Sequence, residues 1–282
     1  MKVLVTGYNG QLGYDVIKRL TARGIECKGV DIGDFDLTDA QATESYIKNY
    51  APTDVIHCAA YTAVDRAEET KELCYAVNVG GTENVAQACR NNHARMVYIS
   101  TDYVFSGEGD QPFEVDAPKA PQSQYGLTKL LGEEKVKDCL NEYFIIRISW
   151  VFGVNGKNFI KTMLRLGAEK SELTVVNDQI GSPTYTYDLA ILIADLIATN
   201  HYGTYHATNE GYCSWYEFAC AIMKEAGLPM VIKPVTSDQY PAKAIRPKNS
   251  RLSKASLDQI GLARLPSWQD ALKRYLIELK DL

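Results

Sequence analysis

A tyrosine and a lysine four residues apart, Tyr125 and Lys129, could carry out proton transfer together. On a helix this spacing places both side chains on the same face. A cation beside a phenol favours the phenolate, so we expect Lys129 to lower the pKa of Tyr125. Thr101 follows an apolar run, 96–99, that is typical of a buried strand, and its hydroxyl can point into a cleft at the carboxyl edge of a sheet. These three side chains predict carbonyl–alcohol redox chemistry, provided that a hydride carrier binds nearby.

A glycine-rich turn near the amino terminus predicts the site of that carrier. The apolar run 2–6 is followed by Gly7, Gly10 and Gly13, and by a helical pattern over 11–23. Glycines at this spacing bring backbone N–H groups against a pyrophosphate at the start of a helix, where the helix dipole also favours an anion. Between a first strand and a first helix this motif indicates a dinucleotide site, and a glycine turn without a ligand is the alternative.

An acidic residue follows the second predicted strand. Segment 25–30 ends at Asp31, whose carboxylate suits the 2′-hydroxyl of an adenine ribose. The same carboxylate would repel a 2′-phosphate, and residues 32–34 offer no arginine to pair with one. We therefore expect NADH to be used at least comparably to NADPH. In the alternative interpretation, Asp31 only caps a turn.

The composition is that of a soluble enzyme. The 282 residues are 46% hydrophobic and 23% charged, with a net charge of −5, which does not suggest a nucleic-acid surface. No stretch approaches the roughly 20 apolar residues of a membrane span, and the first residues do not resemble a signal peptide. The seven cysteines form no C-x-x-C pair, so we expect free thiols in a cytoplasmic protein and no metal held by them.

Strands and helices alternate in the order that builds a parallel sheet. The fold class we predict is α/β: a doubly wound, Rossmann-like parallel sheet with a smaller α/β substrate-binding lobe towards the carboxyl terminus. The expected strands are 2–6, 25–30, 54–58, 95–100, 143–148 and 173–176, and the expected helices are 11–23, 39–50, 67–91, 123–140 and 186–199.

The character of the sequence changes after Trp150, which suggests two domains. We assign 1–150 to a dinucleotide-binding domain, to which 171–200 returns. Segments 151–170 and 201–282 form the substrate-binding lobe. A ligand then belongs in the cleft between the two parts.

Two histidines and one asparagine have readings other than catalysis. His57 and His206 lie in apolar, strand-like runs, where a packed core histidine is the better interpretation. Asn78 falls inside the predicted helix 67–91 beside two glycines, where an amide competes with helical hydrogen bonds. A helix kink and a functional role are about equally supported for Asn78.

With these motifs the chain resembles the extended short-chain dehydrogenase/reductase superfamily and, within it, the dTDP-4-dehydrorhamnose reductases. The resemblance covers essentially the whole length. The glycine motif and Tyr-x-x-x-Lys identify only the superfamily, whereas the other matching segments are found in fewer of its families. The matching segments are Gly7 to Gly13, Ala59 to Asp65, Ser100 to Phe105, Tyr125 to Lys129, Arg147 to Phe152, Asn158-Phe159, Asp178 to Thr184 and Arg246 to Leu252.

The resemblance implies reduction of the C4 keto group of dTDP-4-dehydro-6-deoxy-L-mannose by NADPH or NADH, giving dTDP-L-rhamnose for cell-surface polysaccharide. It implies that Tyr125 donates the proton, that Lys129 activates it and anchors the nicotinamide ribose, and that Thr101 polarises the carbonyl. Asp102 and Trp150 match positions that contact the sugar. The implied cofactor-binding residues are Gly7, Gly10, Gln11, Leu12, Gly13, Asp31, Asp36, Leu37, Ala59, Ala60, Tyr61, Tyr125 and Lys129.

The substrate's diphosphate must be held although the whole protein is acidic. Arg246 and Arg251 flank the polar segment 247–250, and a guanidinium suits bidentate phosphate contacts from a loop. We expect Arg251 to bind the diphosphate, whereas in the alternative reading both arginines are solvated surface charges.

Some relatives form homodimers through a magnesium ion held by carboxylates. Asp15 and Glu278 fit two such positions, but Tyr187 stands at the third. This departure argues against the metal and weakens the case for a homodimer.

Two other functions remain as alternatives. One is a nucleotide-sugar epimerase or dehydratase of the same superfamily, although dehydratases carry an Asp-Glu pair after the threonine and this chain has Asp102-Tyr103. The other is a non-catalytic binding or regulatory subunit, against which the intact Thr101, Tyr125 and Lys129 argue.

Overall fold

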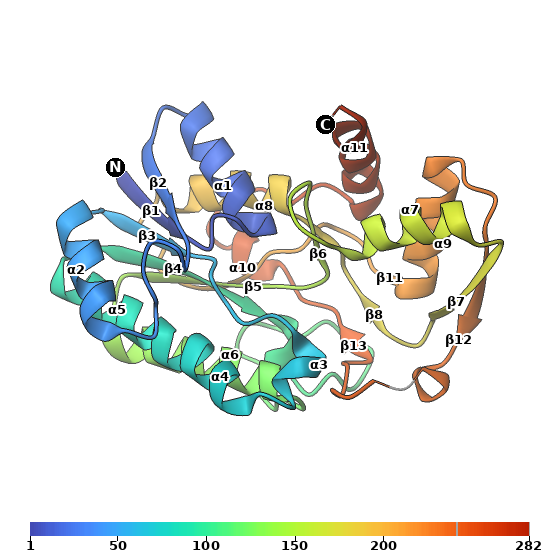
Figure 1. Ribbon diagram of the computed structural model, residues 1–282, viewed down its shortest axis with the longest axis horizontal. Coiled ribbons are helices and arrows are strands. Elements are labelled where there is room, and N and C mark those ends of the chain that lie inside the picture. The colour runs from blue at the N-terminus through green and yellow to red at the C-terminus, as the bar shows by residue number, and fades with distance from the viewer. Residues whose placement is uncertain (241, 282) are drawn as a thin grey trace.

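A six-stranded parallel sheet forms the centre of the computed structural model, which describes residues 1–240 and 242–281 (Figure 1). The strand order is β10-β5-β4-β3-β1-β2, and every neighbouring pair is parallel. Continuous apolar runs account for this arrangement, because a parallel sheet is covered on both faces. The strands are β1 (Lys2–Thr6), β2 (Glu26–Val30), β3 (Asp54–His57), β4 (Arg95–Thr101), β5 (Tyr143–Ile148) and β10 (Gly203–His206).

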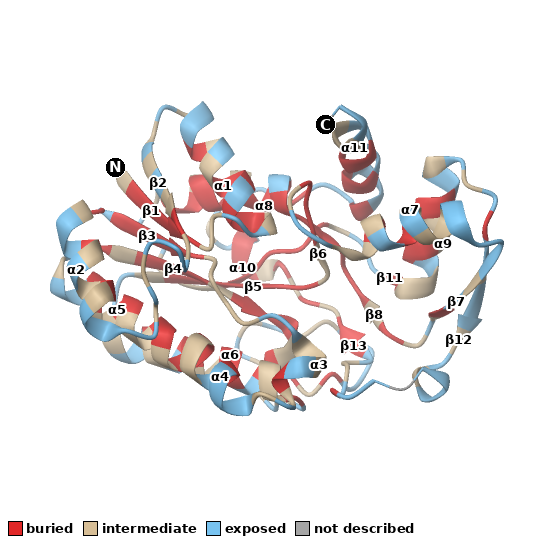
Figure 2. Cartoon of the chain, viewed as in Figure 1, coloured by how far each residue is buried: buried red, intermediate tan, exposed pale blue. Residues whose placement is uncertain are grey.

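Helices cover both faces of this sheet, which confirms the doubly wound α/β class. Val3 and Val5 of β1 pack in one core with α1 (Gln11–Ala22) and α8 (Thr186–Leu196). Leu4 points to the opposite face, because successive side chains of a strand alternate. It packs there with α2 (Ala40–Tyr50), α5 (Thr82–Asn91) and α6 (Gln124–Cys139). The buried strands and the exposed outer surfaces of the helices can be followed in Figure 2.

The connection between β3 and β4 is not the single helix 67–91 that the sequence suggested. It consists of α3 (Val64–Ala67), α4 (Lys71–Tyr75), a π-helical turn (Ala76–Gly81) and α5. Asn78 lies within the π-helical turn and is 1% exposed. A π-helical turn inside a helix frequently accompanies a functional site.

A second group of elements packs around its own core (Figure 1). Its helices are α7 (Phe159–Glu169), α9 (Trp215–Ala226) and α11 (Trp268–Lys280), and its short strands pair as follows. β7 (Glu172–Val176) pairs with β12 (Val231–Val235), and β6 (Val151–Phe152) with β9 (Thr184–Tyr185); β8 (Ile180–Gly181) lies between β11 (Cys213–Ser214) and β13 (Asn249–Ser250). The remaining short helices are Asp102–Val104, Ser237–Gln239 and α10 (Ala255–Asp258).

One predicted member of the main sheet lies elsewhere. Residues 173–176 do form a strand, β7, but it pairs with β12, and β10 occupies the sixth place beside β5. The burial of β7 is uneven, with Glu172 and Thr174 exposed, whereas the strands at the centre of a parallel sheet are buried on both faces. The division into two domains stays a prediction, and the pairing of two strands departs from it. β7 lies in the segment 171–200 that was assigned to the dinucleotide-binding domain, but it pairs with β12. β10 lies in the segment assigned to the substrate-binding lobe, but it pairs with β5 of the main sheet.

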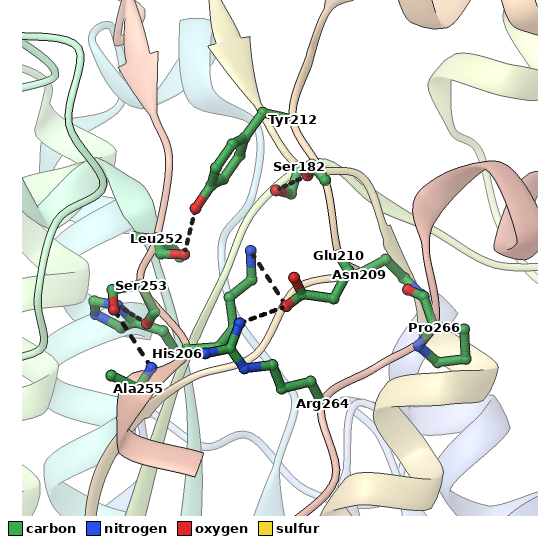
Figure 3. A network of polar contacts seen from close by, with 12 residues as sticks. Ser182, His206, Asn209, Glu210, Tyr212, Leu252, Ser253, Ala255, Arg264 and Pro266 are labelled. Atoms are coloured by element: carbon green, nitrogen blue, oxygen red, sulfur yellow. Dashed lines mark hydrogen bonds and ion pairs between the residues drawn. The ribbon is translucent and has the colours of Figure 1, made fainter. Parts of the chain in front are cut away.

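Both histidines in strand-like runs are core residues, as predicted. His57 Nδ1 lies 2.7 Å from the Thr6 hydroxyl, and burial lowers the pKa of His57 to about 3. His206 Nδ1 is 3.1 Å from the Ser253 carbonyl oxygen, within a polar network that ties the loop after β10 to the chain around α10 (Figure 3). In the same network Arg264 lies 3.6 Å from Glu210. This network anchors the segment that carries Arg251.

A buried ion pair joins α6 to β5. Glu133 is fully buried and accepts two hydrogen bonds of 2.7 Å from the Arg147 guanidinium, which is 1% exposed. The Ser100 hydroxyl of β4 donates to the same carboxylate at 2.6 Å. Gly132 lets α6 approach this closely, because a Cβ there would lie 2.2 Å from the Tyr98 hydroxyl. The helix is thus fixed against β4 and β5 one turn beyond Lys129.

We expect Glu133→Gln to lower the free energy of unfolding by about 3–5 kcal/mol, since it leaves a buried guanidinium without an anionic partner. Urea denaturation would measure the change. Glu83→Gln is the matched control, because it breaks a partly exposed 3.1 Å pair with Lys135 between α5 and α6. The control should cost less than about 1 kcal/mol. Equally small losses in both variants would contradict a structural role for the buried pair.

Candidate functional site

A cavity of about 840 Å³ opens where the parallel strands end. This is the usual ligand position in an open α/β sheet, and the volume is in the range of small-molecule sites. Most of the predicted site residues line it. They are Gly7, Gly10, Gln11, Leu12, Gly13, Asp31, Asp36, Leu37, Ala59, Ala60, Thr101, Asp102, Tyr125, Lys129 and Trp150.

The glycine-rich turn has the shape that a bound phosphate group needs. Gly7 has a φ of 68°, and a Cβ at Gly13 would lie 2.3 Å from the Gly7 carbonyl oxygen. Only glycine therefore lets α1 start directly against the strand end, with Gly10 as its N-cap. The first backbone N–H groups of the helix and the positive end of its dipole lie at this turn.

The side chain of Gln11 is already engaged by the segment 153–158. Its Oε1 accepts hydrogen bonds from Gly153 N at 3.0 Å and Asn158 Nδ2 at 3.1 Å. Gln11 therefore links the glycine-rich turn to the start of α7, a contact that the sequence analysis did not foresee. Nothing in the spacing of the two segments along the chain pointed to it.

Thr101, Tyr125 and Lys129 all line this cavity. Thr101 ends β4 and is 5% exposed, while Tyr125 and Lys129 lie on the same side of α6. The Tyr125 ring packs edge-on against Tyr103, with centroids 5.5 Å apart. Lys129 is 2% exposed, and its Nζ lies 4.0 Å from the centroid of the Tyr98 ring.

The electrostatics of this group differ from the sequence prediction. Burial raises the pKa of Tyr125, and the hydrogen bond with Thr101 only partly opposes the rise. Burial also lowers the pKa of Lys129 to about 7, opposed by the carboxylate of Glu133. The pKa of Tyr125 is thus raised rather than lowered, contrary to the expectation from the sequence, because burial disfavours the phenolate and the charge of Lys129 makes no resolved contribution. Tyr125 therefore holds its proton and is suited to act as an acid.

Asp102 and Trp150 lie beside this group. Asp102 accepts a 2.9 Å hydrogen bond from the Thr101 hydroxyl, and burial raises its pKa to about 6. Trp150 adopts a positive φ of 49°, which is unusual for a bulky residue. Residues in such backbone conformations are often found at functional sites. Its ring stacks on Trp215 with centroids 3.7 Å apart. Trp215 also lines the cavity and was missed, because no motif in the sequence singled it out.

Asn78 has a structural explanation. Its Oδ1 accepts from Tyr61 N at 2.7 Å, and its Nδ2 donates to the Tyr61 carbonyl oxygen and the Thr128 hydroxyl, both at 3.1 Å. Asn78 thus holds the segment after Ala60 against α6. Of the two readings that the sequence left open, a helix kink and a functional role, these contacts and the π-helical turn support the structural one.

Three predicted residues lie outside the cavity lining. Tyr61 directs its hydroxyl to Thr70 at 2.8 Å. Arg246 forms hydrogen bonds of 2.9 and 2.7 Å with the Asp65 carboxylate, which lower the pKa of Asp65 to about 2. Arg251 donates to Asn249 Oδ1 at 3.0 Å. Their roles in binding stay predictions.

The carboxylates that could hold a magnesium ion are paired with protein groups. Glu278 forms an ion pair with Lys18 at 2.8 Å and accepts a hydrogen bond from Tyr185, and Asp15 accepts one from Thr186. Tyr187 supplies no carboxylate. This donor set does not fit a magnesium site, and no step below involves a metal.

A family model described as RmlD substrate binding domain matches residues 1–280. The chain belongs to this family. Within residues 1–240 and 242–281, no helix has both the length and the apolar character to cross a membrane.

Relatives of this RmlD chain match it over almost its full length. The spore coat polysaccharide biosynthesis protein SpsK of Bacillus subtilis is 43% identical over 277 residues, covering 98% of this chain and 97% of that protein. A dTDP-4-dehydrorhamnose reductase from Clostridium acetobutylicum has a TM-score of 0.97 and 42% identity, covering 99% and 100% of the two chains. The enzyme of the same name from Bacillus anthracis, solved in complex with NADP, has a TM-score of 0.96 and 43% identity, with the same coverage.

The buried Lys129 leads to a pH-dependent stability prediction. Its pKa is about 7 in the folded chain, whereas an exposed lysine has a pKa of about 10.4. Between these values the unfolded chain binds more protons, so Lys129 makes folding more favourable as the pH rises. We expect the stability of the wild type relative to Lys129→Met to increase between about pH 7 and pH 9. Denaturation of both proteins at the two pH values would measure this increase, which cannot exceed about 1.4 kcal/mol per pH unit for a single titrating group. A constant or falling difference would contradict the lowered pKa.

Proposed function

We propose that this chain is an NAD(P)H-dependent oxidoreductase, a dTDP-4-dehydrorhamnose reductase that converts dTDP-4-dehydro-6-deoxy-L-mannose to dTDP-L-rhamnose. The observation that carries the proposal is that Thr101, Tyr125 and Lys129 line the same cavity as the glycine-rich turn. The names of the C. acetobutylicum and B. anthracis relatives support the same reaction.

The donor set of the cavity fits a dinucleotide cofactor. The Gly10 N–H donates to the Gly7 carbonyl oxygen, so the N–H groups of the first turn of α1, at Gln11 and Leu12, suit a pyrophosphate. The carboxylates of Asp31 and Asp36 suit the adenosine side. The small side chains of Ala59 and Ala60 leave room beside the backbone. Gly7, Leu12, Gly13, Leu37 and Tyr61 complete the proposed cofactor site, together with Tyr125 and Lys129 near the nicotinamide.

A nicotinamide cofactor, when bound, supplies the hydride for the carbonyl carbon. Tyr125 keeps its proton because burial raises its pKa, so it can give this proton to the carbonyl oxygen. Rotation of the Thr101 hydroxyl redirects its hydrogen from Asp102 to the same oxygen, where it stabilises the developing alkoxide. Lys129, when protonated, stabilises the phenolate that remains.

The substrate part of the proposal rests on three further residues. Asp102 and Trp150 line the cavity next to Thr101 and suit the sugar. We propose Arg251 for the diphosphate, because it lies on the segment after β13 and does not form an ion pair with any described residue, whereas Arg246 is paired with Asp65.

Other parts of the proposal concern organisation and location. We propose that 1–150 forms the cofactor domain, with 171–200 returning to it, and that 151–170 and 201–282 form the substrate lobe. A cytoplasmic location is supported by the seven free cysteines. A homodimer remains a proposal without the metal bridge, and no nucleic acid or membrane partner is proposed.

We expect Tyr125→Phe to lower turnover by at least about 10²-fold, because positioned acid catalysis contributes about 10² to 10⁴-fold. The assay follows NADH or NADPH absorbance with dTDP-4-dehydro-6-deoxy-L-mannose as substrate. Cofactor binding should persist, and Tyr14→Phe, an exposed tyrosine of α1, is the control. Conversion of the sugar without net cofactor oxidation would indicate an epimerase instead. Near-normal turnover of Tyr125→Phe would show that Tyr125 is not the proton donor.

The position of Asp31 predicts the cofactor preference. Its Oδ2 accepts a 3.3 Å hydrogen bond from Asn9 N, and the carboxylate lines the cavity. Because it would repel a 2′-phosphate, we expect a kcat/KM with NADH at least comparable to that with NADPH. Asp31→Ala should shift the ratio towards NADPH. A preference of the wild type for NADPH of about 100-fold or more, about 2.7 kcal/mol, would contradict this prediction.

A further inference from the structure

We infer that Lys157 binds the pyrophosphate of the cofactor and that residues 153–158 form the second wall of the pyrophosphate site. The inference deepens the proposed function and rests on it. The first wall is the glycine-rich turn, which offers backbone N–H groups but carries no cationic side chain. Lys157 and Gly156 line the same cavity from the opposite segment.

Hydrogen bonds tie this segment to the turn. Asn155 Nδ2 donates to the Asn9 carbonyl oxygen at 2.6 Å, and Gly153 N and Asn158 Nδ2 both donate to Gln11 Oε1. Lys157 therefore lies between two residues that contact the amino-terminal end of α1. Its flexible side chain is within reach of an anion at that end.

The backbone around Lys157 is held from the other side as well. Lys161 Nζ donates to the carbonyl oxygens of Val154 at 2.6 Å and Gly156 at 3.0 Å. Asn158 caps α7 by accepting from Lys161 N at 3.0 Å. These contacts fix the segment, so the cation is presented from a defined backbone position.

The charges in the cavity favour this role. Among residues 1–240 and 242–281, its lining includes the acids Asp31, Asp36 and Asp102 but only two cations, Lys129 and Lys157. Lys129 is buried with its Nζ over the Tyr98 ring, whereas Lys157 is exposed and forms no ion pair with any described residue. In a chain of net charge −5, a dianionic pyrophosphate at the turn needs a local positive group, and Lys157 is the one placed there.

Binding of NADH and NADPH to the purified chain, measured by calorimetry, tests the inference. Lys157→Met removes the charge and keeps most of the apolar stem. We expect it to lower the affinity for NADH and for NADPH equally, by about 10-fold, because that is the size of the contribution of a hydrogen bond to a charged group. Lys157→Arg should restore most of the affinity. Lys170→Met removes an exposed lysine at the far end of α7 and should leave both affinities unchanged. Added salt should lower the cofactor affinity of the wild type more than that of Lys157→Met.

Three outcomes would overturn the inference. An unchanged cofactor affinity of Lys157→Met would show that Lys157 does not contact the pyrophosphate. A loss confined to NADPH would place the ammonium at the 2′-phosphate, and a loss confined to the sugar nucleotide would place it at the substrate diphosphate. Failure of the wild type to bind either cofactor would instead overturn the proposed function, so the two failures are distinguishable.

Discussion

The contact between Glu133, Arg147 and Ser100 is the constraint on which the arrangement of the site depends. It joins α6 to β5 and β4 inside the protein, where neither charge can be satisfied by water. A buried charge without a partner is costly, so the helix cannot slide along the sheet without losing this contact. Lys129 lies one turn before Glu133, and Thr101 directly follows Ser100. The ion pair therefore determines how the helix presents Tyr125 and Lys129 to the end of β4.

Burial also sets the protonation states at the site. The same desolvation raises the pKa of Tyr125 and lowers that of Lys129, since it disfavours the charged form of each. A phenol that keeps its proton suits the direction of a reduction, in which the carbonyl oxygen gains a proton. In the proposed reaction, the charge of Lys129 then matters most after Tyr125 has given up its proton, when a phenolate is present.

The cavity is enclosed by segments that are distant in sequence. Trp150 follows β5 and stacks on Trp215 at the start of α9, while residues 153–158 contact the glycine-rich turn. Asp65 and Arg246 form a further link between α3 and the chain before β13. Each of these contacts joins the Rossmann-like sheet to the group of α7, α9 and α11. The main sheet and this second group are thereby held together by aromatic stacking and hydrogen bonds rather than by one continuous element.

Local patterns in the sequence were sufficient for the fold class and the glycine-rich turn, and the resemblance built on them gave the family and many of the residues that line the cavity. The apolar runs of β1 to β5 predicted their strands within a residue or two, and the glycine spacing predicted the start of α1, because both signals depend on neighbouring residues alone. Only the tertiary structure decided that β7 leaves the main sheet and that Asn78 clamps Tyr61. It also decided that Gln11 contacts residues 153 and 158, that Trp215 enters the cavity and that the pKa of Tyr125 rises. These features depend on pairing between distant segments and on burial, which the order of residues along a chain does not reveal.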